Sequence, residues 1–339
     1  MMHLPSRQSA TPRGTRLLTR GEVAELLDLD ACIDAVESAF RAHAEGLTMP
    51  PGILSAAAAG GAFHVKTAGL DLGRPYFAAK VNGNYYDNAA RGLPRVQGVI
   101  VLCDAENGYP IAVLDSIEIT LRRTAAASAV AARHLALEDA AVATICGCGV
   151  QGRMHLAMLC RVRRLGRAFA YDLVPGVAEG FAEETSRELN LEVLPTEDLT
   201  KACRESQIVV TCTPSRQPLL GPGDVSPGAF LAAVGADSEE KQELAPELLQ
   251  QAGLVVDHLE QCATIGELHH ALERGLLERS DVLAELHQVV GGQHPGRTSR
   301  EQVLIFDSTG VALEDVAAAA RVFELAEAKG VGTLMELLN

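Results

Sequence analysis

The stretch AVATICGCGVQGRMH, residues 141–155, is the strongest indication of the fold. Its apolar start predicts a buried strand, its glycines predict a tight turn, and its end predicts the first turns of a helix. The glycines Gly147, Gly149 and Gly152 follow the spacing G-x-G-x-x-G. In that setting the missing side chains let the backbone turn sharply and approach a pyrophosphate at the helix N-terminus. A glycine spacing alone is weak evidence, so the residues around it matter.

An acidic residue stands where such a site needs one. Asp172 lies 20 residues beyond Gly152, at the end of the next apolar run, and a carboxylate there can accept hydrogen bonds from ribose hydroxyls. The alternative is a solvated aspartate that starts a turn before Pro175. Because Leu173 and Val174 follow instead of an arginine, the sequence favours NAD, with NADP as the second possibility. The residues expected to bind this cofactor are Gly147, Gly149, Val150, Gln151, Gly152, Asp172 and Thr213.

The chain from 141 to 310 alternates short apolar runs with helical patterns. Runs that barely alternate in polarity and are separated by helices predict a parallel sheet covered on both faces. The predicted fold class is therefore α/β, with a Rossmann-type doubly wound sheet. The predicted strands are 141–146, 168–172, 191–194, 208–212, 230–234, 254–257 and 303–307, and the predicted helices are 150–164, 176–189, 196–205 and 243–251.

The chain before this region has a different pattern. An amphipathic helical pair is predicted over 20–46, and antiparallel strands joined by Gly, Asn and Pro turns are predicted between 49 and 115. A long helix over 116–137 leads into the parallel sheet, and a helix after residue 307 returns toward the first part. We therefore expect a flexible tail (1–19), an α+β substrate-binding domain (20–125, with 311–339 returning) and an NAD-binding domain (126–310).

Composition narrows the classes of partner. The net charge of −15 argues against a nucleic acid or an anionic membrane, since either would need a basic face. No apolar run reaches the roughly 18 residues of a membrane span, and the basic start of the chain has no apolar segment typical of a secretion signal. The sequence thus predicts a cytoplasmic protein that acts on a small molecule.

The cysteines and histidines do not predict a metal site. Eight cysteines are scattered mostly through apolar segments, which is typical of buried free thiols in a reducing compartment. Cys146 and Cys148 flank Gly147 and have no second pair at ligand spacing. His269 and His270 fall in a polar helical stretch. We expect no bound metal.

Four motifs in fixed order resemble the ornithine cyclodeaminase and mu-crystallin family, over about residues 20–325. They are KVNGNYYDNAARGLPRVQGVIVLCDAENGYPIAVLDSIEITLRRTAAASAVAARHLA, GCGVQGRMH, AVGADSEEKQEL and FDSTGVALED. The resemblance implies ornithine or lysine cyclodeaminase, alanine dehydrogenase or imine reductase chemistry, or ligand binding of the crystallin kind. It also implies a homodimer in which the first domain supplies a shared sheet.

The resemblance assigns roles to residues of these motifs. Lys80 is similar to the lysine over the substrate carboxylate and imine, Arg123 to the arginine that grips the carboxylate, and Asp237 to the acid beside the nicotinamide. Ser308 and Thr309 resemble the segment at the nicotinamide edge. Physical chemistry supports each role, because an arginine fork binds a carboxylate bidentately and a lysine beside a forming iminium works best with a lowered pKa. The alternative for Arg123, with Arg122 as its neighbour, is a solvated helix position.

The chain departs from the ornithine cyclodeaminase pattern at three matched positions. Gly52 stands where that pattern has a carboxylate-binding arginine, His64 where it has a glutamate, and Arg95 where it has a threonine. Lys66, Arg95 and His64 are further candidates for binding the substrate, with a surface role as the alternative. Strict ornithine cyclodeaminase activity is therefore not expected.

The function predicted from these residues is hydride transfer between NAD and the carbon of a C–N bond, in a small amino acid or its 2-imino acid. A closed cycle of the same steps is a cyclodeaminase, which oxidises a diamino acid, releases ammonia and regains the hydride. Another alternative is a non-catalytic protein that holds cofactor and ligand. The candidate catalytic residues are Lys80, Asp237 and Arg123.

Overall fold

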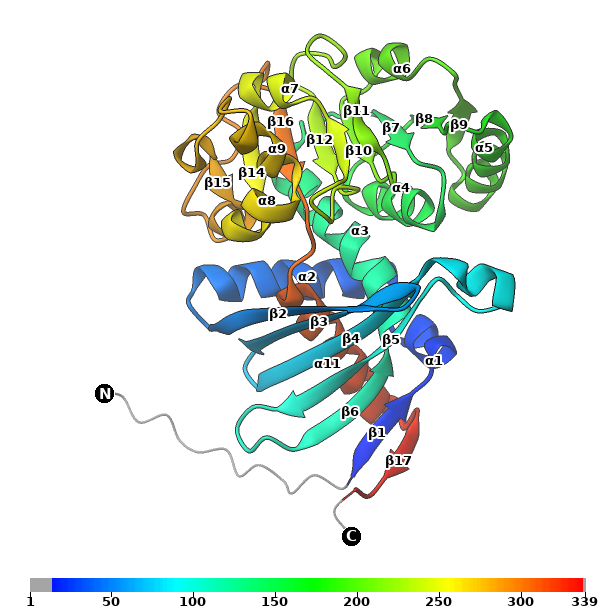
Figure 1. Cartoon of the computed structure of the whole chain (residues 1–339), viewed down its shortest axis with the longest axis vertical. Helices are drawn as coiled ribbons and strands as arrows, with labels where there is room; N and C mark the ends of the chain where they lie inside the picture. The colour runs from blue at the N-terminus through cyan, green and yellow to red at the C-terminus, as the bar shows by residue number, and fades with distance from the viewer. Residues whose placement is uncertain (1–13, 338–339) are drawn as a thin grey trace.

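The computed structural model describes residues 14–337 and is built on two large sheets, each with its own helices, placed one above the other (Figure 1), with a small two-stranded sheet beside the upper one. Of the predicted tail over residues 1–19, residues 1–13 lie outside the described part of the chain. Its last part is not a tail, because strand β1 (Thr15–Leu18) already pairs with two other strands. Thr15 is buried and its hydroxyl donates to the Pro110 carbonyl at 2.6 Å, which ties this strand into its sheet.

The upper sheet has eight parallel strands, which confirms the α/β fold class. Its central strands are buried at every residue, as expected for strands covered on both faces. The strands in spatial order are β15 (Ala284–Glu285), β14 (Gly253–Val256), β16 (Leu304–Asp307), β12 (Phe230–Ala233), β10 (Ile208–Thr211), β7 (Val142–Cys146), β8 (Arg167–Tyr171) and β9 (Glu192–Pro195).

The order of this sheet places a crevice at its carboxyl edge. From β7 the chain adds β8 and β9 on one side and β10, β12 and β16 on the other, and ligands of open α/β sheets bind where the strand order reverses in this way. The helices of this part are α4 (Val150–Val162), α5 (Pro175–Leu189), α6 (Leu199–Glu205), α7 (Pro246–Gln251), α8 (Leu259–Ile265), α9 (Glu267–Glu273), η2 (Arg279–Asp281) and α10 (Leu286–Val290).

The lower sheet has seven strands, antiparallel except for the parallel pair β1 and β6. Along β4 the side chains alternate, and Tyr76, Ala78, Lys80 and Asn82 are buried on the face covered by α11. Helices α1 (Arg20–Leu26) and α2 (Leu29–Ala44) complete this part. The strands in spatial order are β17 (Thr333–Met335), β1, β6 (Pro110–Asp115), β5 (Val96–Asp104), β4 (Pro75–Tyr85), β3 (Gly61–Asp71) and β2 (Thr48–Ala58), with η1 (Tyr86–Arg91) after β4.

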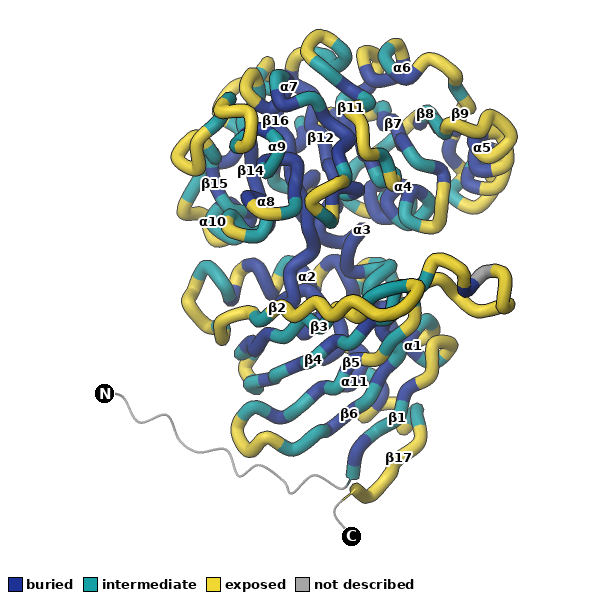
Figure 2. The backbone as a smooth tube through the Cα atoms, in the orientation of Figure 1, coloured by how far each residue is buried: buried dark blue, intermediate teal, exposed yellow. Residues whose placement is uncertain are grey.

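Two buried connections join the parts. Helix α3 (Ser116–Leu135) begins at Asp115, whose carboxylate caps it by accepting from the backbone N–H groups of Ile117 and Glu118. The chain returns after β16 into helix α11 (Ala312–Lys329), and Figure 2 shows both connections as buried backbone. The proposed domain limit at 125 falls inside α3, which runs unbroken through it.

One helix was predicted too long. The first residues of the expected helix over 243–251 form strand β13 (Gln242–Leu244), which pairs with β11 (Arg216–Leu220), and α7 covers only the rest. The Glu243 carboxylate, buried in this strand, accepts from the backbone N–H groups of Thr213 and Gly235. Among the described residues, no helix combines the length and the hydropathy needed to cross a membrane.

Candidate active site

The glycine loop after β7 is shaped by its neighbours. Gly147 has φ +104°, and a Cβ there would lie 2.9 Å from the Cys212 carbonyl oxygen. A Cβ on Gly152 would lie 2.1 Å from the Gly147 carbonyl oxygen, whereas one on Gly149 would meet nothing within 4 Å. Two of the glycines are therefore required by the protein's own packing, and the middle one borders open space.

The residues predicted to hold the cofactor gather around this loop. The Asp172 carboxylate accepts from the backbone N–H of Cys148 at 3.0 Å and of Val174 at 3.1 Å, so it is fixed beside the loop. Val150 is exposed at the start of α4, and the buried Gln151 Oε1 has no hydrogen-bond partner among the described residues. Thr213 lies over the loop, with its Cγ2 3.1 Å from the position of a Cβ on Gly147.

Lys80 and Arg123 meet in a buried cluster of charges. The Nζ of Lys80 lies 2.5 Å from a carboxylate oxygen of Asp315 and 3.5 Å from the Thr120 hydroxyl. Arg123 donates from Nη1 to Glu314 at 2.7 Å and from Nε to Asp315 at 3.0 Å. The side chains of these four charged residues are at most 6% exposed, so the ions compensate one another rather than being solvated.

Lys66 joins this cluster from the neighbouring strand. It lies directly opposite Lys80 in the antiparallel pair of β3 and β4. Its Nζ donates to the carbonyl oxygens of Gly310 at 2.7 Å and Thr309 at 3.4 Å. Gly310 has φ +77°, and a Cβ there would lie 2.4 Å from Nη1 of Arg123. Glycine is therefore required at position 310, where the chain that leaves β16 passes the guanidinium of Arg123.

Burial and neighbouring charges shift the pKa values in this cluster. Burial lowers the pKa of Lys80 to about 7; the nearby positive charges of Arg123 and Lys66 act in the same direction and Asp315 opposes them. Burial raises the pKa of Glu314 to about 7 despite Arg123. Burial would also raise the pKa of Asp315, but Lys80 and Arg123 hold it below its usual value. At neutral pH the cluster thus contains two groups close to half-protonation.

The segment that follows β16 is held in place by the carboxylate of Asp257. Asp257, at the end of β14, accepts from the backbone N–H groups of Thr309 (2.7 Å) and Gly310 (2.6 Å) and from the Thr309 hydroxyl (2.9 Å). Gln261 donates to the same hydroxyl at 2.9 Å. Ser308 is buried, and its Oγ has no hydrogen-bond partner among the described residues. Of the two predicted residues, Thr309 is engaged by the protein, and the Ser308 hydroxyl is left without a partner among the described residues.

Three predicted residues lie outside the buried cluster. Asp237, in the loop after β12, is exposed and pairs with Lys241 at 2.5 Å. Arg95 stacks over the Tyr86 ring at 4.4 Å and donates to Asn84. His64 shares the cluster's face of β3 but is exposed and contacts Ser55, in the wall of a hollow of about 410 Å³ at the end of the β2–β3 hairpin. Their predicted roles stay predictions.

Sequence reasoning missed the acids that complete the site. Glu314 and Asp315 stand side by side in the otherwise apolar run VALEDVAAAA, and Asp257 ends the apolar run LVVD. Carboxylates in segments that are otherwise buried need partners, and that is the signal that could have identified all three.

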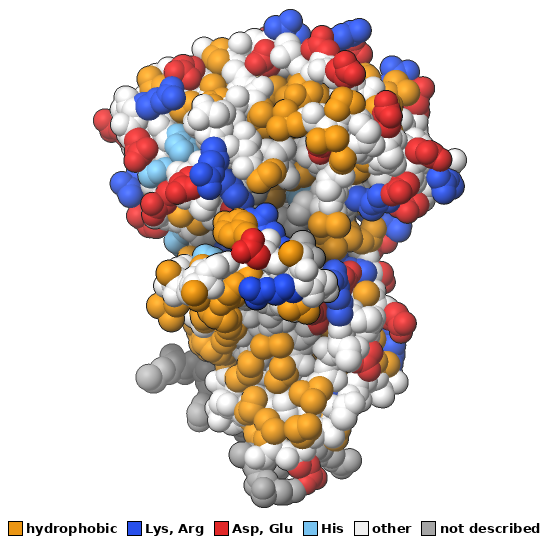
Figure 3. Space-filling model, turned by 45° about the vertical axis from the view of Figure 1, so that its right-hand side comes forward, with side chains coloured by type: hydrophobic (Ala, Val, Ile, Leu, Met, Phe, Trp, Pro, Cys, Tyr) orange, Lys and Arg blue, Asp and Glu red, His pale blue; other side chains and the backbone are white. Residues whose placement is uncertain are grey.

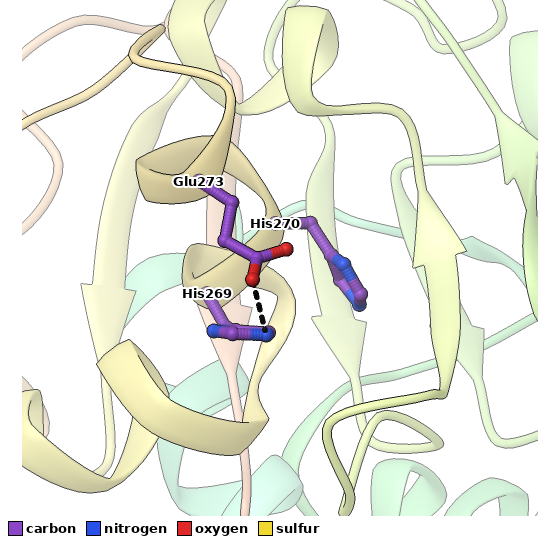
Figure 4. Close-up of side chains that lie close together, drawn as sticks. All are labelled: His269, His270 and Glu273. Carbon is purple, nitrogen blue, oxygen red and sulfur yellow. Dashed lines mark ion pairs between the residues drawn. The ribbon is translucent and has the colours of Figure 1, made fainter.

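A separate group of titratable side chains lies on α9 (Figure 4). His269 and Glu273 face one another at 3.6 Å, while the His270 ring turns away from them and its Nε2 lies 2.8 Å from the Lys241 carbonyl oxygen. The ligand atoms of the three side chains lie within 4.8 Å of one another. His270 links α9 to the loop that carries Asp237. The expectation of no bound metal stays a prediction.

The model of one protein family matches nearly all of the described chain. The model of the ornithine cyclodeaminase/mu-crystallin family matches residues 13–330. The chain belongs to this family. The predicted resemblance is thereby confirmed.

Named members of the ornithine cyclodeaminase/mu-crystallin family are similar over nearly the whole chain. An uncharacterized cyclodeaminase of Sinorhizobium fredii is 39% identical, covering 95% of this chain and 98% of its own length. The alanine dehydrogenase of Archaeoglobus fulgidus is 37% identical, covering 96% and 99%.

Two solved structures of relatives contain a nicotinamide cofactor. An archaeal alanine dehydrogenase dimer with bound NAD superposes with a TM-score of 0.91 at 35% identity, covering 96% of this chain and 99% of its own. The Δ1-pyrroline-2-carboxylate reductase of Thermococcus litoralis, in complex with NADH and L-proline, has a TM-score of 0.89 at 32% identity, covering 95% and 100%.

Proposed function

We propose that this chain is an NAD-dependent oxidoreductase that transfers a hydride to or from the carbon of a C–N bond, in a small amino acid or its 2-imino acid. The observation that carries the proposal is the cluster formed by the buried Lys80 and Arg123 with the half-buried Lys66, beside the segment that leaves β16. That segment leaves the carboxyl end of β16, and the glycine loop leaves the carboxyl end of β7, so both lie at the same edge of the parallel sheet. The two relatives solved with NAD or NADH agree with this cofactor.

The residues of the loop fit the cofactor. The space at Gly149 accepts a pyrophosphate at the uncapped N-terminus of α4. The Gln151 amide oxygen, which can only accept, and the Ser308 hydroxyl have no hydrogen-bond partner among the described residues, which leaves capacity for polar groups of the cofactor. The fixed carboxylate of Asp172 suits ribose hydroxyls. Bound there, the nicotinamide supplies or accepts the hydride.

The buried cations bind and protonate the substrate. The ion pairs of Arg123 use Nε and Nη1, and we assign Nη2 to the substrate carboxylate. In the reductive direction the imine carbon gains the hydride and the nitrogen gains a proton, which Lys80 gives up from Nζ. In the oxidative direction the neutral Lys80 takes that proton back. Residues 20–125 and 311–339 then form the substrate domain, and 126–310 the NAD domain.

A cyclodeaminase is the second candidate, since the relative from Sinorhizobium fredii carries that name. The same cluster would oxidise a diamino acid, hold the imine while the side-chain amine displaces ammonia, and then reduce the cyclic imine. The matched positions Gly52 and His64 do not reproduce the ornithine pocket, so we place the simple reductase or dehydrogenase first.

A homodimer completes the proposal. On the outer face of the lower sheet, Val65, Val81 and Val99 form one row across β3, β4 and β5, and Val99 is 43% exposed. Figure 3 shows hydrophobic side chains gathered over the lower part of the molecule. An antiparallel sheet that faced water would carry polar residues there, and the archaeal alanine dehydrogenase relative is a dimer.

An assay panel tests the function. NADH and NADPH oxidation is followed at 340 nm with pyruvate plus ammonia, pyruvate plus methylamine, Δ1-pyrroline-2-carboxylate and Δ1-piperideine-2-carboxylate, and ammonia release is measured with ornithine and lysine. Oxidation of NADH by an imino acid is the expected result. Ammonia release without net cofactor change would identify the cyclodeaminase. If the protein binds NADH but shows neither NADH oxidation nor ammonia release with any substrate, both enzymatic candidates are contradicted and a ligand-binding protein is favoured.

A further inference from the structure

Lys66 is a half-buried cation beside the active-site cluster, and the proposed hydride transfer gives it no role. It is directly opposite Lys80 in register, and directly opposed residues of an antiparallel pair have Cβ atoms about 5 Å apart. Like charges placed there repel. A sheet has no structural need for two lysines at such a pair, so the arrangement calls for a chemical reason.

The contacts of Lys66 keep its charge in place beside Lys80. Its Nζ donates to the backbone carbonyls of Thr309 and Gly310, and no carboxylate lies within ion-pair distance of it among the described residues. Lys80 by contrast has Asp315 at 2.5 Å. Because Lys66 donates to neutral oxygens, the positive charge of its protonated form has no direct acidic partner and acts on Lys80. Burial and Arg123 lower the pKa of Lys66 itself, and Asp315, Asp257 and Glu314 oppose them.

We propose that Lys66 is a positioning residue for proton transfer: its ammonium, held by the Gly310 carbonyl and set opposite Lys80, disfavours the protonated form of Lys80 and so lets that lysine release its proton near neutral pH. The inference rests on the proposed function, in which Lys80 exchanges the substrate proton. A second cation near an amine is a known means of lowering its pKa.

Groups from three further elements face Lys80. Helix α11 presents Glu314 and Asp315, helix α3 presents Arg123 and the neutral Thr120, and β5 presents the apolar Ile100 opposite Lys80. Asp257 lies beyond Lys66, on the backbone N–H groups of the same segment. The acids favour the protonated form of Lys80. Burial, Arg123 and Lys66 all disfavour the protonated form. Arg123 is engaged by direct ion pairs with both acids of α11, whereas Lys66 has no acid at ion-pair distance among the described residues.

The test measures the titration of Lys80 directly, without turnover. The protein is labelled with lysine carrying ¹³C at Cε, and the Lys80 signal is assigned by its loss in Lys80→Arg. Lys66→Met and Lys66→Gln are expected to raise the midpoint of the Lys80 titration by about one pH unit, and Lys66→Arg is expected to leave it in place. Lys66→Gln serves as the second uncharged variant, since its amide keeps a donor for the carbonyls.

Gln261→Leu is the matched control. Gln261 donates to the same carbonyls of Thr309 and Gly310 at 3.3 and 3.2 Å but carries no charge, so its loss should leave the Lys80 midpoint unchanged. An unchanged midpoint in Lys66→Met and Lys66→Gln, or an equal shift in Gln261→Leu, would overturn the proposal. The pH profile of kcat/KM is recorded for the same variants: if the Lys80 midpoint moves and the profile does not, Lys66 still acts on Lys80, and the assignment of Lys80 to the reaction fails.

Discussion

At the scale of single residues, Arg123 has two tasks that a variant can separate. Arg123→Ala leaves Glu314 and Asp315 buried without their guanidinium partner, and removing one member of a buried pair costs roughly 3–5 kcal/mol. We therefore expect a lower free energy of unfolding as well as lost activity, measured by urea denaturation and NADH oxidation.

The double variant Arg123→Met, Glu314→Gln is the control for that loss. It removes one buried acid together with the arginine, so it should recover part of the free energy of unfolding and none of the activity. Recovery of activity would show that the substrate carboxylate binds elsewhere.

The pKa of Lys80, about 7, predicts opposite pH dependences for the two reaction directions. Below this value Lys80 is protonated and can donate, so the reductive kcat/KM should fall as pH rises through about 7. The oxidative direction needs the neutral amine, so its kcat/KM should rise over the same interval.

Lys80→Arg keeps a positive charge for Asp315 but cannot exchange the proton near neutral pH. Its activity should fall by about 10²–10⁴-fold with a normal melting temperature. A Lys80→Arg enzyme with the parent pH profile would remove Lys80 from the reaction.

The cations of the site could be predicted from the sequence, and their partners could not. All four residues stand in motifs of the family, but nothing in those motifs pairs Glu314 and Asp315 with Lys80 and Arg123, which they meet because α11 returns across the lower sheet. The position of α11 on the lower sheet cannot be predicted from the sequence. Asp237 shows the same limit, because its pairing with Lys241 depends on the conformation of one loop.

At the scale of elements, the turn from β7 into α4 offers a matched pair of variants. Gly152→Ala would force a Cβ to within 2.1 Å of the Gly147 carbonyl oxygen, whereas Gly149→Ala meets no protein atom. Both should weaken NADH binding, measured by fluorescence titration. Only Gly152→Ala should lower the melting temperature. If Gly149→Ala binds NADH as the parent does, the pyrophosphate does not lie at this turn.

The parallel strands could be predicted because burial on both faces leaves near-continuous apolar runs, as in β10 and β12. Strand β13 could not, because its sequence, Gln242, Glu243 and Leu244, lacks the apolar pattern and is held by hydrogen bonds of buried polar groups. Strand β1 was likewise hidden, since its pairing with β6 and β17 joins residues far apart in the chain.

At the scale of the whole molecule, the apolar outer face of the lower sheet predicts association. Val99→Glu should convert the proposed dimer to a monomer in sedimentation experiments, because it places a charge in the valine row. Val177→Glu on α5 is the control, since Val177 is 42% exposed, close to the 43% of Val99, and lies on the upper part. A dimer that survives Val99→Glu would place the interface on another surface.

Hydride transfer from the nicotinamide to the carbon of the C–N bond can be followed with a deuterium label. The protein is incubated with NADH deuterated at C4 of the nicotinamide and with the imino acid that it reduces fastest, and the amino acid product is analysed by NMR and mass spectrometry. We expect one deuterium on the α-carbon of the product. A product with no deuterium there, formed while deuterated NADH is consumed, would contradict hydride transfer to the carbon of the C–N bond.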